Sequence, residues 1–109
     1  MAAPVVPELE VSIPEEVRAF AKACGVEQYL PEVIAMTQRL YPSRLLRLVI
    51  EEDPEIANDR RICLEVDVTG FSVDQLVQTQ WQWNEEIFKV CPATHVWVFQ
   101  QLWFCGEDA

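Results

Sequence analysis

Apolar positions recur along this chain with two different periods, and the switch between them predicts its elements. A three-four spacing typical of one helix face runs over 12–24 and again over 27–41. Gly25 separates these segments and favours the left-handed conformation in which helices end. We therefore expect two short helices, the first opened by a capping box that Ser12 and Glu15 form.

Strict alternation of apolar and polar positions follows in two segments, 45–51 and 61–68, with a polar stretch between them. This period of two predicts the strands of an antiparallel hairpin. One register puts both apolar rows on the same face and also brings opposite charges together. It pairs Ile50 with Ile62, Glu51 with Arg61, and Arg47 with Glu65.

A long helix and a last strand complete the pattern. Ser72 and Gln75 form a second capping box, which opens a helix over Val73–Cys91, and the apolar run 95–104 predicts a strand. The order α-α-β-β-α-β gives an α+β fold with a three-stranded, mostly antiparallel sheet packed against helices. The pattern leaves open whether the last strand lies beside the first or the second.

The chain has 109 residues, half of them apolar, which is typical of one globular domain. We expect a single domain over 1–109, with a loose arm over 1–11 and a frayed tail over 106–109. The N-terminus has no basic start followed by an apolar run, and no stretch approaches the length of a membrane helix. We therefore expect a cytoplasmic protein whose four cysteines are reduced.

The charge balance restricts the partners. Eighteen acidic against eight basic residues give a net charge of −10, and only two of the bases are lysines. Nucleic acids and anionic membranes bind clustered basic side chains, so both are disfavoured as partners. A second copy of the chain or another protein, including a basic one, remains compatible with this charge.

No catalytic or cofactor motif emerges from the sequence. Cys91 and His95 are four residues apart, but a thiol at the C-terminal end of a helix is not activated by the helix dipole. The cysteines and the single histidine are scattered, without the local spacing of a zinc site, and no glycine-rich phosphate loop is present. We predict no catalytic residue, metal or cofactor.

Two features remain as candidate sites. The first is a pair of amides one turn apart on the long helix, Gln80 and Asn84, which with His95 would line a pocket between this helix and the sheet. A buried amide without a partner costs about 1–3 kcal/mol, so the same amides are also explained by bonds to nearby backbone.

The second feature is one row of the last strand, which contains Trp97, Phe99, Gln101 and Trp103. If helices cover only the other face of the sheet, this aromatic row is exposed and marks an interface. If helices cover it, the row belongs to the core. The sequence leaves this alternative open.

Two functions follow from these features. The favoured one is a non-enzymatic protein-interaction module that forms a homodimer, or binds another protein, through the aromatic row or the free edge of the last strand. The alternative is a small-molecule-binding domain or small enzyme with its pocket between the long helix and the sheet.

Overall fold

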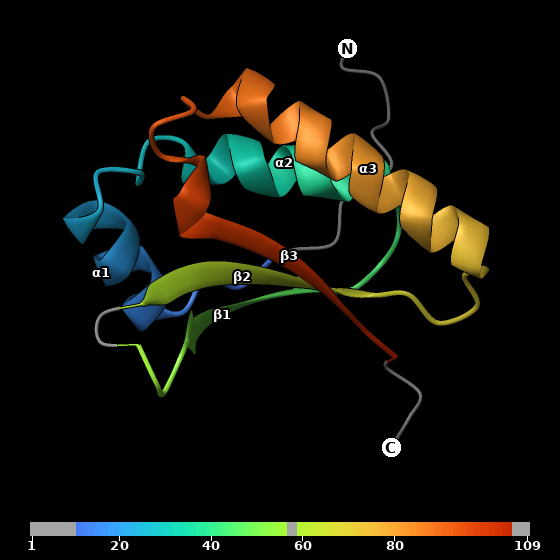
Figure 1. Cartoon of the computed structure of the whole chain (residues 1–109), viewed down its shortest axis with the longest axis horizontal. Helices are drawn as coiled ribbons and strands as arrows, with labels where there is room; N and C mark the ends of the chain where they lie inside the picture. The colour runs from blue at the N-terminus through green and yellow to red at the C-terminus, as the bar shows by residue number, and fades with distance from the viewer. Residues whose placement is uncertain (1–10, 57–58, 106–109) are drawn as a thin grey trace, which may run out of the picture.

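A computed structural model describes residues 11–56 and 59–105 of the chain. It contains the expected elements in the expected order, an α+β fold with three α-helices and three strands (Figure 1). The elements are α1 (Glu15–Ala23), α2 (Leu30–Leu40), β1 (Leu46–Glu52), β2 (Arg60–Asp67), α3 (Val73–Val90), the 3₁₀ turn η1 (Val96–Val98) and β3 (Phe99–Phe104).

The hairpin register predicted from the sequence is confirmed. β1 and β2 pair antiparallel, and the register pairs Ile50 with Ile62, Glu51 with Arg61, and Arg47 with Glu65. Arg47 and Glu65 form an ion pair of 3.1 Å. The apolar period of two and the cross-strand charges were thus sufficient to specify this pairing.

The last strand lies beside the second one. The strand order is β1-β2-β3, and β3 runs parallel to β2. The sheet is therefore mixed, with one antiparallel and one parallel pair. α3 provides the crossover that a parallel neighbour requires.

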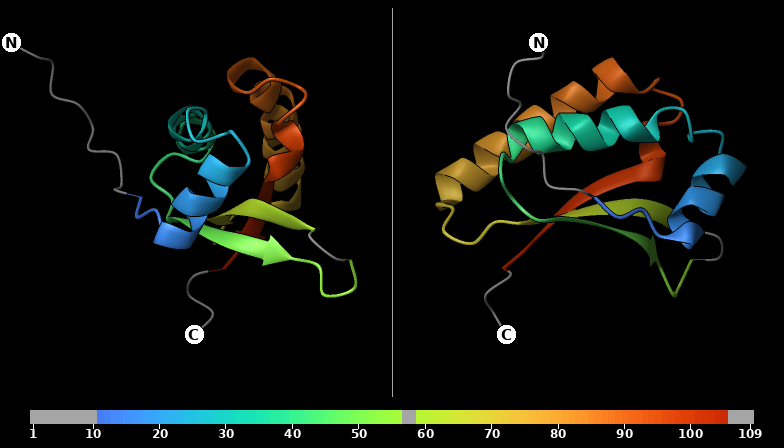
Figure 2. Two further views of the ribbon diagram at one scale, coloured as in Figure 1. Left: turned by 90° about the vertical axis from the view of Figure 1, so that its left-hand side faces the viewer. Right: turned by 180° about the vertical axis from the view of Figure 1, so that it is seen from behind.

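The helices leave one face of the sheet open. α2 and α3 lie side by side over the same face, while α1 packs at the β1 side (Figures 1 and 2). The inner face consists of three rows that run across all strands, and the register groups them as Leu46/Val66/Trp103, Leu48/Leu64/Gln101 and Ile50/Ile62/Phe99. Most of these side chains are buried and form the core.

A buried hydrogen bond fixes α3 against α2. Trp83 is 4% exposed, and its indole N–H donates to the Thr37 hydroxyl at 2.8 Å. That hydroxyl in turn donates to the Val33 carbonyl at 2.8 Å. Because a buried polar group without a partner is costly, this chain of bonds also fixes the direction in which Trp83 points.

One of the two predicted capping boxes is present. The Ser72 hydroxyl accepts from the Gln75 N–H at 3.1 Å, and the Gln75 side chain accepts from the Ser72 N–H at 2.8 Å. The box predicted at Ser12 is wrong, because α1 begins only after Pro14, whose backbone is still extended. A residue that precedes proline avoids the helical region, so Ile13 cannot start the helix.

The last strand begins later than predicted. Residues 95–104 were expected to be extended, but Val96–Val98 form η1 and only Phe99–Phe104 form β3. This turn is closed by the Val98 N–H, which donates to the His95 carbonyl at 3.1 Å, and the Trp97 indole donates to the Thr94 carbonyl at 3.0 Å. The predicted arm over 1–11 and tail over 106–109 lie outside the described residues, except for Val11.

Replacing Thr37 with valine keeps the side-chain shape but removes the acceptor for the Trp83 indole. We expect the free energy of unfolding, measured by urea denaturation, to fall by about 1–3 kcal/mol. Thr79→Val is the matched control, because the Thr79 hydroxyl bonds to the Gln75 carbonyl on the exposed side of α3. Equal stability of the two variants would show that the Trp83 bond does not fix α3.

Candidate interaction surface

The aromatic row of the last strand is divided between core and surface. Phe99 and Gln101 are 6% and 5% exposed and face the helices. Trp103 lies on the same inner face near the strand end and is 40% exposed, whereas Trp97 lies in η1 and is 57% exposed. Only the two tryptophans of this predicted interface are therefore accessible.

Polar contacts join this row to Tyr41, the residue that directly follows α2. The Trp103 indole donates to the Tyr41 hydroxyl at 3.2 Å, and that hydroxyl donates to the Gln101 side-chain oxygen at 2.9 Å. Burial raises the pKa of Tyr41, an effect that the bond from Trp103 partly offsets. Gln101 thus satisfies a buried hydroxyl, and Trp103 contributes to the fold as well as to the surface.

The long helix divides its apolar positions into a buried and an exposed set. Leu76, Trp83, Ile87 and Val90 pack against the core. The exposed set lies on the adjacent flank, and its members are 57–73% exposed: Val73, Val77, Trp81 and Phe88. With about 100° of rotation per residue, these four side chains and Asn84 share an arc of about 80°. We call these five residues the α3 stripe.

The amides predicted to line a pocket lie at this stripe. The Gln80 side-chain N–H donates to the Asn84 side-chain oxygen at 3.0 Å on the exposed side of α3. His95 lies beyond the end of the helix, with its ring 6.2 Å from that of Tyr29 and its Nδ1 2.9 Å from the Thr94 hydroxyl. The three residues are therefore not brought together.

The open face of the sheet alternates polar and apolar side chains, and no large apolar side chain of β1, β2 or β3 is strongly exposed on it. The Arg47 guanidinium lies 3.9 Å from the centre of the Phe104 ring as well as beside Glu65. Cation–π contacts and ion pairs of this kind are common on protein surfaces that stay in contact with water. This face thus lacks the apolar character of the α3 stripe.

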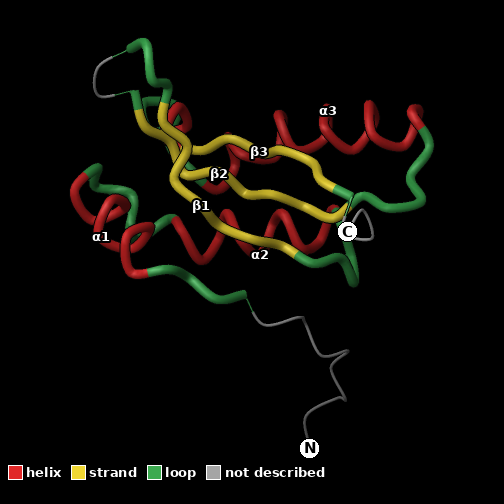
Figure 3. Tube along the Cα trace, turned by 90° about the horizontal axis from the view of Figure 1, so that it is seen from below, coloured by secondary structure: helices red, strands yellow, loops and turns green. Residues whose placement is uncertain are grey.

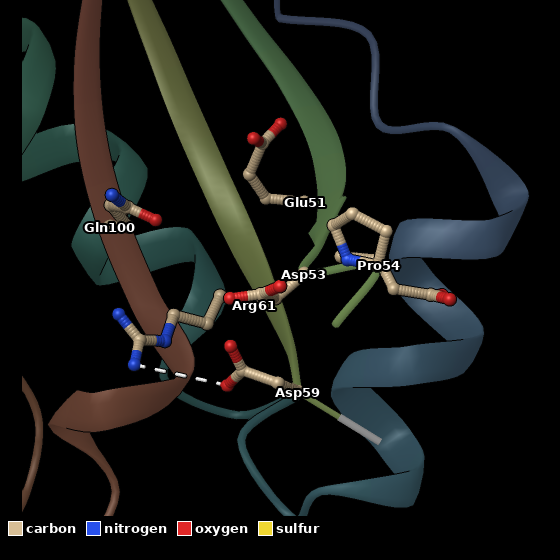
Figure 4. A pocket seen from close by; sticks show the side chains of 7 residues that line it. Glu51, Asp53, Pro54, Asp59, Arg61 and Gln100 are labelled. Carbon is tan, nitrogen blue, oxygen red and sulfur yellow. Dashed lines mark ion pairs between the residues drawn. The ribbon is translucent and has the colours of Figure 1, made fainter. Parts of the chain in front are cut away.

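A hollow of about 390 Å³ lies where the hairpin loop meets this open face (Figure 4). Its walls are polar and mostly acidic, and Figure 4 shows Arg61 and Asp59 in an ion pair of 3.9 Å. The full lining is Glu51, Glu52, Asp53, Pro54, Asp59, Arg61 and Gln100. Small-molecule sites are mainly apolar with few polar groups, and this hollow has the opposite composition.

Cys63 and Cys91 have the character of packed thiols, whereas Cys105 is exposed. Cys91 is buried, its pKa is raised by that burial, and its sulfur lies 3.7 Å from the Pro92 carbonyl oxygen. Burial first, and then Glu65 and Glu51, raise the pKa of Cys63 to about 12. Within 11–56 and 59–105, no three Cys, His, Asp or Glu side chains gather as metal ligands would.

Comparison with protein-family models, curated proteins and solved structures finds no match to this chain. Among the described helices, none combines the length and the apolar character needed to cross a membrane. The candidate site thus depends on the geometry alone, and the exposed apolar flank of α3 is its main feature.

The predictions from the sequence did not include this flank, because the apolar positions of α3 form one wide arc in which no part is marked as exposed. A signal was present in the sequence, since eight apolar positions around a helix exceed the width that one packing face covers. The packing of Leu76, Ile87 and Val90 against the core, together with the bond from Trp83 to Thr37, decides which part of the arc is buried.

The thiols give a direct test of these environments. At pH 8 we expect Cys63 not to react with a disulfide reagent in the folded protein, since it is fully buried and a pKa of about 12 leaves roughly one thiolate in ten thousand. Cys105 is exposed and should give the fast phase, which Cys105→Ser should remove. A fast phase that persists in this variant would contradict the assignment, and urea should make all four cysteines reactive.

Proposed function

We propose that this chain is a non-enzymatic protein-interaction module that forms a homodimer. The observation that carries the proposal is the exposed apolar surface of α3, in which Val73, Val77, Trp81 and Phe88 are each at least 57% exposed. Monomeric proteins rarely expose contiguous apolar patches larger than a few hundred Å², and larger ones mark interaction sites.

The residue types support an interface rather than incidental exposure. Aromatic residues are enriched at the centres of interfaces, and tryptophan is the most frequent among the residues that dominate binding energy. Trp81 and Phe88 alone can bury roughly 150–250 Å² each when fully covered. A homodimer would remove these side chains from water without a second protein.

The setting that we propose is the cytoplasm. All four cysteines are free, and two of them are packed in the interior as small apolar side chains. Free buried cysteines are typical of reducing compartments. The net charge of −10 keeps the rest of the surface soluble and also allows a basic protein as a further partner.

The proposal predicts self-association that depends on exposed aromatic side chains. We expect light scattering to give a dimer at tens of micromolar protein, and we expect Trp81→Ala to weaken the dimer at least tenfold, or about 1.4 kcal/mol. Phe88→Ala tests the second exposed aromatic of α3. Trp97 and Trp103 are left intact because their indoles are bonded to Thr94 and Tyr41.

Leu45→Ala is the control, since Leu45 is half exposed just before β1, at the opposite side of the sheet. It should leave the dimer unchanged. A wild-type protein that stays monomeric, or a dimer that both aromatic variants leave intact, would refute the proposed homodimer.

A further inference from the structure

The α3 stripe faces away from the rest of the molecule. Trp83 points to Thr37 of α2, and the centre of the stripe lies about 120° further around the helix. Figure 3 shows α3 at the β3 side of the sheet and α2 at the β1 side. Within the described part of the chain, the flank that carries the stripe therefore looks outward beyond β3.

The stripe has an internal two-fold pattern. Val73 and Phe88 lie at equal numbers of residues from the midpoint between Gln80 and Trp81, and so do Val77 and Asn84. Two copies of α3 that run antiparallel about this midpoint would bring Val73 of each against Phe88 of the other. An isologous interface requires such self-complementarity, whereas a different partner does not.

We infer that the homodimer forms by antiparallel packing of two α3 helices, with its two-fold axis beside Gln80 and Trp81. This inference rests on the self-association proposed above and adds its surface and register. In this arrangement Val77 of each copy faces Asn84 of the other, and the two Trp81 side chains meet near the axis.

The charges beside the stripe favour antiparallel over parallel packing. Asp74 lies in the first turn of α3 and Lys89 in the last. Lys89 is already paired with Glu86 at 2.8 Å, so the gain of an antiparallel arrangement comes from the helix dipoles, which oppose each other in it. Parallel helices would bring Asp74 against Asp74 and Glu85 against Glu85, which is unfavourable.

The amide pair supports a defined register. Gln80 and Asn84 are bonded to each other, so one amide donor and one acceptor remain satisfied when the stripe is covered. A polar residue within an apolar helix seam is a well-attested means of fixing register.

A charge pair tests the register. Val77→Lys alone and Asn84→Glu alone should each raise the dimer dissociation constant at least tenfold in sedimentation equilibrium. The double variant should return to within about threefold of wild type, because the introduced lysine faces the introduced glutamate of the other copy. Within one helix the two positions are seven residues apart and too far for an ion pair.

Matched controls carry the same charge changes on the polar side of α3. Gln82 and Gln78 are exposed there, and neither Gln82→Lys nor Gln78→Glu should change the dissociation constant of the dimer. Circular dichroism of each variant checks that the fold is retained, as expected for exposed positions.

The outcomes separate the two proposals. A dimer that single variants weaken and the double variant restores supports both. A dimer that the single variants leave unchanged, or that the double variant fails to restore, overturns the antiparallel register and leaves self-association standing. A wild-type protein that is monomeric at every concentration overturns both.

Discussion

The rotation of α3 about its own axis determines what this protein shows to its surroundings. The hydrogen bond from Trp83 to Thr37 fixes that rotation, because a buried indole N–H has few alternative partners. With Trp83 directed to α2, Ile87 enters the core and Trp81 turns outward. A small rotation of α3 about its axis would bury a different part of its apolar arc. The hydrogen bond in the interior therefore also determines which apolar side chains form the exposed stripe.

The two surfaces that remain open, the face of the sheet without helices and the exposed flank of α3, differ in their side chains. The face of the sheet without helices alternates charged and apolar side chains. There Arg47 forms an ion pair with Glu65 and a cation–π contact with Phe104. The exposed flank of α3 has apolar side chains with a single amide pair among them. Water solvates the first surface at little cost, whereas covering the second gains hydrophobic free energy, so association through α3 is favoured.

Much of the fold, but little of the surface, could be predicted from the sequence. The hairpin register followed from local pattern, since an apolar period of two and opposite charges agree on pairing Ile50 with Ile62. The capping box at Ser72 was equally local. Three other features depend on contacts between segments that are distant in the sequence: which strand pairs with β3, the burial of Phe99 and the rotation of α3. The local pattern of apolar positions does not determine them.

The central claim is that Trp81 is covered by a second copy while the other tryptophans keep their environments within one chain. Two-dimensional NMR of the four indole N–H groups over a range of protein concentrations tests it directly. We expect the Trp81 signal to shift as the protein is diluted and the signal of Trp83, whose indole is bonded to Thr37, to stay in place. A stationary Trp81 signal alongside a concentration-dependent Trp103 signal would contradict it.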